Sequence, residues 1–376
     1  DYFIPKPVDP RLITEVSIAV AKAAMNSGVA RKKITDWNAY REHLKELMGY
    51  ESEFIRQLFS MARSNPQKVV FAEGNHPNMI KAAVEARAEG ICNPILLGND
   101  ERIGKIAKRL KLNLDGIEIV NLRHDKESAR RERYAAILAK KRAREGATYD
   151  EACDKMFEPN YFGMMMVETG DADAFITGTY TKYSNTIKVA KEVIGIREGY
   201  DHFGTMHIVN SKKGTYYIAD TLINRHPDTK TLIDIALLAD HTVKFFNHTP
   251  VMAMLSYSNF GADTEGSPKT VHDAVDFLQK EYPDLMIEGE MQVNFAFDNE
   301  LRDRKFPFNK LKGKTVNTLV FPNLSSANSA YKLIQDMSDA ELIGPIQMGL
   351  NKPVHFTDIE SSVRDIVNIT AVAAVD

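Results

Sequence analysis

Short apolar, β-rich runs alternate with longer amphipathic segments from residue 68 onward. The runs that we predict to be strands are 68–72, 94–97, 117–120, 172–176, 206–209, 215–219, 251–255 and 316–321. The segments with helical apolar spacing between them include 78–89, 126–145, 149–168, 230–246 and 269–281. This alternation is typical of an α/β fold with a mainly parallel, helix-covered sheet. Residues 211–214 separate two adjoining strand runs, which indicates one antiparallel hairpin inside the pattern.

Residues 1–65 follow a different pattern, because they contain no strand-like run. Three prolines lie near the start, and residues 12–30 and 37–62 then have helical apolar spacing, with Asp36 as the expected N-cap of the second stretch. We therefore predict a helical connector over residues 1–65, followed by an α/β region over residues 66–376. A chain of 376 residues also favours two packed lobes over one core.

Composition excludes several kinds of partner. The net charge of -3 creates no general attraction to nucleic acid or to an acidic membrane, so local groups must hold any anionic ligand. Cys92 and Cys153 lie far apart without metal or redox spacing, and the chain contains neither a signal peptide nor an apolar run of about 18 residues. We expect a cytoplasmic protein. Because the chain begins without methionine, we interpret it as part of a longer one.

The first candidate site lies at residues 178–186, which read Gly-Thr-Tyr-Thr-Lys-Tyr-Ser-Asn-Thr between a predicted strand and a predicted helix. A helix N-terminus rich in small hydroxyl residues can bind an anion through backbone N–H groups and the helix dipole. Lys188 would add a positive charge. An ordinary capped helix without a ligand is equally compatible with this run, whose candidate ligand groups are Thr181, Ser184, Asn185 and Thr186.

Three other segments place polar residues after predicted strands. Residues 255–263 form a polar loop at the carboxyl end of a strand, where parallel α/β sheets bind ligands. Glu288 and Glu290 have the two-residue spacing of one strand face and could bind a cation, although a structural role is favoured. Residues 321–331 bring small and amide side chains to a strand-to-helix junction. The chain contains no metal-binding motif and no dinucleotide fingerprint.

These segments together resemble the phosphate acetyltransferase (phosphotransacetylase) family. The segments that carry the resemblance, in family order within residues 66–376, are 255–258 (Leu-Ser-Tyr-Ser), 288–292 (Glu-Gly-Glu-Met-Gln), 320–324 (Val-Phe-Pro-Asn-Leu), 327–332 (Ala-Asn-Ser-Ala-Tyr-Lys), 344–350 (Gly-Pro-Ile-Gln-Met-Gly-Leu) and 352–354 (Lys-Pro-Val). Residues 4–13 and 20–29 are similar to the end of the catalytic region of bacterial malic enzymes. The whole chain thus resembles the C-terminal part of a hybrid malic enzyme of the MaeB type.

The resemblance implies a fold and an assembly. It implies two three-layer α/β subdomains with a cleft between them, the second inserted or following from about residue 205. It also implies a homodimer or higher homo-oligomer assembled through the second subdomain. The ligand would be acetyl-CoA, with no cofactor in this part of the chain. The malic enzyme region of the same polypeptide would use NADP and a divalent metal to convert malate to pyruvate.

The chain departs from the family at most positions that serve catalysis. Aligned from Pro353, the family serine falls on Asp358 and the adjacent arginine on Ile359, while Asp365 retains the carboxylate of the base. Of the other family arginines, one falls on Lys188, one on Asp336 and only the most N-terminal on an arginine, Arg142. Losing one oxyanion donor typically lowers a rate ~10²–10³-fold. Two like charges ~4 Å apart repel by about 4 kcal/mol at an effective dielectric constant near 20.

Three hypotheses follow from these departures. The chain is a non-catalytic regulatory domain that binds acetyl-CoA as an allosteric inhibitor of a malic enzyme, an active phosphate acetyltransferase, or a purely structural oligomerisation domain. The residues at 358 and 359 favour the first and third hypotheses, since phosphate would meet a carboxylate there and Lys cannot reproduce the bidentate fork of Arg. The retained ligand-facing loops favour the first over the third.

Overall fold

The computed structural model describes residues 12–37, 40, 41, 44, 52–180 and 183–376. The chain divides into two compact units, residues 1–57 and residues 58–376. In the first unit, a π-helical turn at Leu12–Val16 continues into helix α1, Ser17–Asn26. Lys22 lies over the ring of Trp37, with 5.2 Å between its Nζ atom and the ring centroid. The helical prediction for 12–30 is thus confirmed over most of its length, and much of 37–62 falls outside the described residues.

The second unit contains two β-sheets. The first sheet has five strands, all parallel, in the order β11-β4-β1-β2-β3. Its strands are β1 (Gln67–Phe71), β2 (Cys92–Leu97), β3 (Glu118–Val120), β4 (Ala174–Thr177) and β11 (Val354–Phe356). Central strand β4 is buried along its whole length and β1 is buried from Val69 to Phe71, as expected where helices cover both faces of a parallel sheet.

The second sheet has six strands in the order β10-β5-β6-β9-β7-β8. Its strands are β5 (Gly204–Ser211), β6 (Gly214–Ala219), β7 (Met252–Leu255), β8 (Ile287–Met291), β9 (Thr318–Val320) and β10 (Glu341–Met348). β5 and β6 form the predicted hairpin, with Ser211 paired to Gly214, and β10 lies antiparallel to β5. Because β5 to β10 lie between β4 and β11 in sequence, the second subdomain is inserted into the first. The predicted α/β fold with two subdomains is therefore confirmed.

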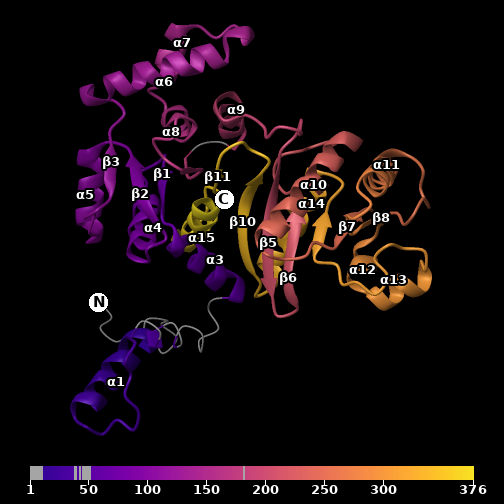
Figure 1. Cartoon of the computed structure of the whole chain (residues 1–376), viewed down its shortest axis with the longest axis horizontal. Helices are drawn as coiled ribbons and strands as arrows, with labels where there is room; N and C mark the ends of the chain where they lie inside the picture. Colours follow the sequence, from indigo (N-terminus) through magenta and orange to yellow (C-terminus); the bar gives the residue numbers. More distant parts are fainter. Residues whose placement is uncertain (1–11, 38–39, 42–43, 45–51, 181–182) are drawn as a thin grey trace. The chain divides into compact units, whose positions relative to one another are not determined.

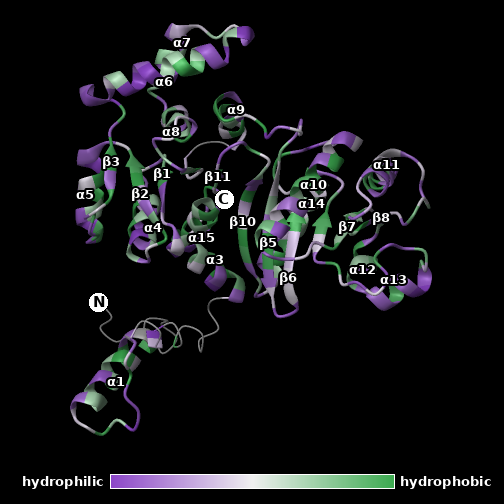
Figure 2. Ribbon diagram, in the orientation of Figure 1, coloured by the Kyte–Doolittle hydropathy of each residue, from purple (hydrophilic) through white to green (hydrophobic). Residues whose placement is uncertain are grey.

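Helices cover both sheets. Those of the first subdomain are α3 (Glu53–Ser64), α4 (Pro77–Ala88), α5 (Asp100–Leu110), α6 (Ser128–Lys141), α7 (Tyr149–Lys155), α8 (Pro159–Glu168), α9 (Tyr183–Val193) and α15 (Val363–Val375). Those of the second are α10 (Thr229–Phe245), α11 (Gly266–Glu281), α12 (Val293–Phe297), α13 (Asn299–Lys305) and α14 (Leu324–Met337). Figure 2 shows a largely hydrophobic β10, whereas the outer helices α5 and α6 carry both hydrophilic and hydrophobic residues.

The two subdomains meet where β10 and β11 follow each other in sequence. Figure 1 shows these strands and α15 close together between the sheets, and α15 contacts both β10 and β1. A second crossing segment follows α9, and the two segments pair with each other through a bridge between Ile196 and Leu350. The junction thus consists of two paired segments, and residues beside it line the cavity described below. Among the described helices, none is long and apolar enough to cross a membrane.

Candidate functional site

A cavity of about 440 Å³ lies between the two subdomains. The first subdomain contributes residues after β4 and β11 and from α9 and α15, and the second contributes residues from β5, α14 and β10. The lining residues are Gly178, Tyr183, His207, Tyr331, Lys332, Gln335, Leu342, Gly344, Thr357, Asp358, Ile359, Glu360, Ser361 and Asp365. Three of the predicted site residues, Asp358, Ile359 and Asp365, therefore lie together at one cavity. The volume of this cavity is within the range of small-molecule sites.

Asp358 and Ile359 lie in the turn after β11, and Asp365 lies in the first turn of α15. Asp358 N donates to Ser361 Oγ at 3.0 Å, and Ser361 N donates to the Asp358 carbonyl oxygen at 3.0 Å. Asp365 takes part in the capping box of α15, because Ser362 N donates to Asp365 Oδ2 at 2.8 Å and Asp365 N donates to Ser362 Oγ at 3.2 Å. One carboxylate oxygen of Asp365 is thus committed to the helix cap. Ile359 is 65% exposed, so it presents an apolar side chain where the family arginine would carry charge.

Negative charge predominates on the cavity wall. Asp358, Glu360 and Asp365 are carboxylates, while Lys332 is the single lysine or arginine among the described lining residues. Burial raises the pKa of Asp358, and Glu360 and Asp365 raise it further, although Lys332 acts in the opposite direction. Burial disfavours the charged form of Lys332, but Tyr331 and the two nearby carboxylates raise its pKa overall. The wall therefore disfavours a phosphate group on electrostatic grounds.

His207 and Tyr331 form a stacked pair on the wall that the second subdomain contributes. Their ring centroids lie 4.1 Å apart with an interplanar angle of 12°. Both side chains are buried, and the pKa of His207 is lowered to about 3 by burial and the nearby Lys332 charge. Burial also raises the pKa of Tyr331, so both rings are neutral near pH 7. The pair joins β5 to α14.

The carboxylate of Glu73, which follows β1 in sequence, binds the start of the predicted anion site at residues 178–186. Glu73 Oε2 accepts hydrogen bonds from Gly178 N at 3.0 Å, Thr179 N at 2.6 Å and Thr179 Oγ1 at 2.6 Å. Glu73 Oε1 accepts from Tyr180 N at 2.8 Å. The backbone N–H groups that a bound anion would need at the start of this segment are thus occupied by Glu73. Thr181 lies outside the described residues.

The remaining candidates of that segment lie on α9. Ser184 and Asn185 are exposed, whereas Thr186 is buried and its hydroxyl has no hydrogen-bond partner among the residues that the structure describes. The side chain of Lys188 is 74% exposed and lies 3.8 Å from Glu192. None of these four residues belongs to the cavity lining given above; Tyr183, in the first turn of α9, does.

Arg142 lies at the C-terminal end of α6, where it pairs with Glu145. Its charge also lowers the pKa of Tyr161, although burial dominates and raises that pKa overall. Arg142 is not a lining residue of the cavity, and the exposed Asp336 on α14 is not one either. The structure thus places Arg142 and Lys188 apart from the wall that carries Asp358.

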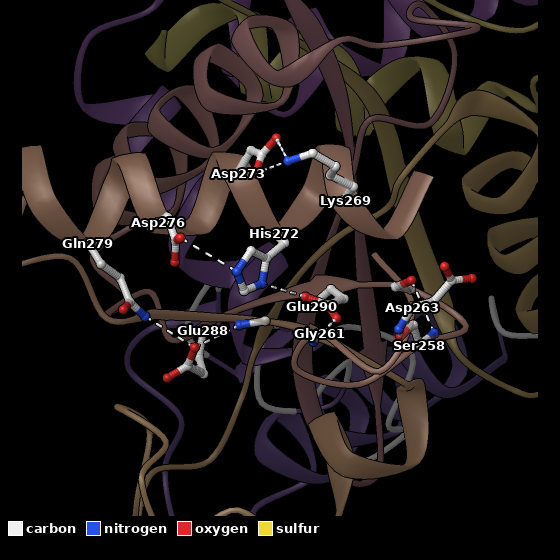
Figure 3. A network of polar contacts seen from close by, with 12 residues as sticks. Ser258, Gly261, Asp263, Lys269, His272, Asp273, Asp276, Gln279, Glu288 and Glu290 are labelled. Atoms are coloured by element: carbon white, nitrogen blue, oxygen red, sulfur yellow. Dashed lines mark hydrogen bonds and ion pairs between the residues drawn. The ribbon is translucent and has the colours of Figure 1, made fainter. Parts of the chain in front are cut away.

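Glu288 and Glu290 make separate polar contacts in the second subdomain. Figure 3 shows Glu290 between Gly261 N and the imidazole of His272, at 2.5 Å and 3.0 Å. Glu288 Oε1 accepts from Gln279 Nε2 at 3.1 Å. These carboxylates anchor the loop after β7 and the helix α11. No cluster of metal-ligating side chains occurs within the described part of the chain.

Sequence reasoning missed His207 and did not single out Lys332. His207 lies within a predicted strand, in which a single histidine carries no functional signal. Tyr331 and Lys332 belong to residues 327–332, one of the segments that carry the family resemblance. They reach the cavity because α14 packs beside β5, where His207 lies 124 residues before Tyr331 in the sequence. Glu73 was also missed, because it lies 105 residues from the backbone N–H groups that it binds.

Comparison with known proteins places this geometry in a family. The model of the family described as phosphate acetyl/butaryl transferase matches residues 53–374. A phosphotransacetylase structure from Streptococcus pyogenes superposes with a TM-score of 0.77 at 30% identity, covering 85% of this chain and 98% of that chain. The phosphate acetyltransferase of Bacillus subtilis is 32% identical over 307 residues, covering 82% of this chain and 94% of the relative.

A malic enzyme matches over a longer stretch. The NADP-dependent malic enzyme of Escherichia coli is 37% identical over 382 residues, which covers 100% of this chain and 50% of the relative. The chain therefore spans about half the length of that enzyme. Because the family model covers residues 53–374, most of the chain, and the two-sheet architecture agrees with it, the chain belongs to the phosphate acetyl/butaryl transferase family.

Proposed function

We propose that this chain is a non-catalytic regulatory domain of a malic enzyme. In this proposal it binds acetyl-CoA as an allosteric inhibitor and mediates homo-oligomerisation. The rest of the polypeptide oxidatively decarboxylates malate to pyruvate with NADP and a divalent metal. The similarity over the whole chain to half of an NADP-dependent malic enzyme supports this assignment.

The charge of the cavity carries the non-catalytic part of the proposal. A transferase must hold phosphate and stabilise an oxyanion, and both tasks need donors and cations. Here Asp358, Glu360 and Asp365 face the space, and Ile359 replaces a family cation. Lys332 opposes these three carboxylates among the described lining residues. We therefore expect acetyl phosphate to be a very poor ligand.

The same cavity supports binding of a thioester ligand. Its second wall contains neutral rings, His207 and Tyr331, together with Leu342, so an uncharged acyl group would meet no like charge there. Lys332 follows Tyr331 on α14, lines the cavity and could pair with a ligand phosphate. Binding that differs between two conformations by about 1–3 kcal/mol suffices for allosteric control.

An apolar face of the second subdomain supports oligomerisation. A groove of about 550 Å³ is lined by Val209, Ile218, Leu319 and Ile334, and Phe297 beside it is 49% exposed. Met337, at the end of α14, is 80% exposed. We infer that a second copy of this chain covers the groove. Sedimentation velocity of the Phe297→Asp variant should show dissociation relative to the unmodified chain.

Calorimetry and a coupled assay test the proposal on the same sample. Titration of acetyl-CoA into the chain should show saturable binding, while acetyl phosphate with CoA should form no acetyl-CoA. Formation of acetyl-CoA that disappears in the Asp365→Asn variant would instead identify an active phosphate acetyltransferase. No heat of binding at millimolar acetyl-CoA would refute the regulatory function.

A further inference from the structure

His207 lies between the cavity and a buried cluster of polar side chains, Thr205, Asp220 and Thr221. Its Nδ1 atom lies 2.8 Å from Thr221 Oγ1. Thr221 Oγ1 in turn lies 3.1 Å from Thr205 Oγ1, which donates to Asp220 Oδ1 at 2.6 Å. The residue is 3% exposed and lines the cavity. Its other ring nitrogen, Nε2, has no hydrogen-bond partner among the described residues.

The hydrogen bonds of Thr205 and Thr221 determine which ring nitrogen of His207 carries the proton. Thr205 Oγ1 gives its single hydrogen to Asp220 and accepts from Leu222 N at 2.9 Å and Thr221 N at 3.2 Å. A hydroxyl has one hydrogen and two lone pairs, so Thr205 has no capacity left for the hydroxyl of Thr221. That hydroxyl therefore donates to His207 Nδ1, and the proton of the imidazole resides on Nε2.

The imidazole is neutral and fixed in place. Burial lowers its pKa to about 3, so the ring carries a single proton across the physiological range. The Tyr331 ring stacks on one side of it. The backbone of Gly344 lies close to the ring as well, since a Cβ atom built there would come within 2.6 Å of His207 Cδ2. A ring held in this way presents Nε2–H in one direction.

We propose that His207 Nε2–H donates a hydrogen bond to the carbonyl oxygen of an acyl thioester, which makes His207 a residue that determines acyl specificity. This inference rests on the proposed function and adds which group of the ligand is recognised, namely the acyl carbonyl. A neutral donor suits a neutral carbonyl, whereas a charged imidazolium would favour phosphate. Free CoA lacks the carbonyl and would gain nothing from this donor.

Paired titrations of acetyl-CoA and CoA into the purified chain test the proposal. His207→Leu removes the donor, and we expect about fivefold weaker acetyl-CoA binding, the typical worth of one neutral hydrogen bond, with CoA changed less than twofold. His207→Gln places an amide nitrogen near the Nε2 position and should retain most of the preference. His241→Leu, on the exposed face of α10, is the matched control and should change neither affinity.

The possible outcomes separate the two proposals. If the unmodified chain binds neither compound, the regulatory function fails and the role of His207 fails with it. If it binds acetyl-CoA and His207→Leu keeps the original preference over CoA, only the role of His207 is wrong. Equal weakening of both ligands would show that His207 contacts another part of CoA and would likewise overturn it.

Nitrogen NMR of the chain with ¹⁵N-labelled histidine gives a readout independent of ligand. We expect the His207 resonances of a neutral ring with the proton on Nε2, unchanged between pH 5 and pH 8. In Thr221→Val, which removes the hydroxyl donor, the Nδ1-protonated form should become populated. A ring that titrates in this range, or one already protonated on Nδ1, would overturn the proposal.

Discussion

Substitution of Glu73 tests whether an internal carboxylate organises the cavity wall. Among the described residues, four donors converge on its two oxygens at 2.6 to 3.0 Å, and three of these are backbone N–H groups of residues 178–180. In Glu73→Gln one oxygen can remain at the Oε2 position, but the amide nitrogen then faces Tyr180 N, donor against donor. The variant also loses the charge that strengthens the other three hydrogen bonds.

The expected magnitude follows from these contacts. One unsatisfied buried donor costs about 1–3 kcal/mol, and weakening of the charge-assisted bonds adds to it, so we expect Glu73→Gln to lower the free energy of unfolding by about 2–4 kcal/mol. Urea titration followed by circular dichroism measures the change. Glu118→Gln is the matched control, because Glu118 is exposed on the edge strand β3, and it should change stability by less than about 0.5 kcal/mol.

A second variant tests the anion-like role directly. Glu73→Ala removes the carboxylate and leaves the backbone N–H groups of residues 178–180 without an acceptor. Sulfate should then stabilise the variant more than the unmodified chain, by about 1.8 kcal/mol at 20 mM if it binds with a Kd of ~1 mM. Equal stability of Glu73→Gln and the unmodified chain, or no differential effect of sulfate, would show that Glu73 does not hold residues 178–180 in place.

Three further predictions concern stability. Gly178→Ala should destabilise the chain by at least about 3 kcal/mol in urea titration, since its Cβ would lie 2.1 Å from the Thr357 carbonyl oxygen. The control Gly146→Ala should cost only about 1 kcal/mol of backbone strain, because no atom lies within 4 Å of its Cβ. Arg302→Met should lower the free energy of unfolding by about 3 kcal/mol, because the fully buried guanidinium binds the carbonyl oxygens of Leu311 and Lys314 at 2.8 Å each. Arg304→Met, at an exposed position, should be nearly neutral, and equal effects would contradict a structural role for the Arg302 hydrogen bonds. Asp358→Asn should stabilise the chain at pH 7, because a raised folded-state pKa means that stability is lost as the pH rises through it; the gain should vanish below the ordinary Asp pKa near 3.8, and a gain that persists there would refute the cause.

Alternation of strands and helices was sufficient to predict the fold class. The predicted strands 206–209 and 215–219 lie within β5 and β6, because both are short runs of mostly apolar, β-branched and aromatic residues. β10 was missed, since Gly344 and Pro345 interrupt it and read as turn residues. β11 was also missed, because it has only three residues. The predicted helix at 149–168 is divided into α7 and α8, and Pro159 occupies the first turn of α8.

The candidate site could be predicted only where the residues are close in sequence. Asp358, Ile359 and Asp365 follow one strand, so their proximity required no tertiary information. The pairing of His207 with Tyr331 and of Glu73 with residues 178–180 depends on long-range packing, which periodicity does not encode. The sequence of residues 178–186 could not reveal that a distant carboxylate binds the N–H groups of residues 178–180, which precede α9.

The rate of malate oxidation by the full-length enzyme, measured against acetyl-CoA concentration, shows whether this domain regulates the enzyme. We expect acetyl-CoA to inhibit the enzyme. We expect Lys332→Glu to raise the half-inhibitory concentration at least about tenfold, since a carboxylate replaces the one lysine or arginine among the described lining residues. Lys312→Glu, at an exposed position outside the cavity lining, should leave the inhibition curve unchanged. A malate oxidation rate that does not respond to acetyl-CoA, or a response indifferent to Lys332→Glu, would contradict the account.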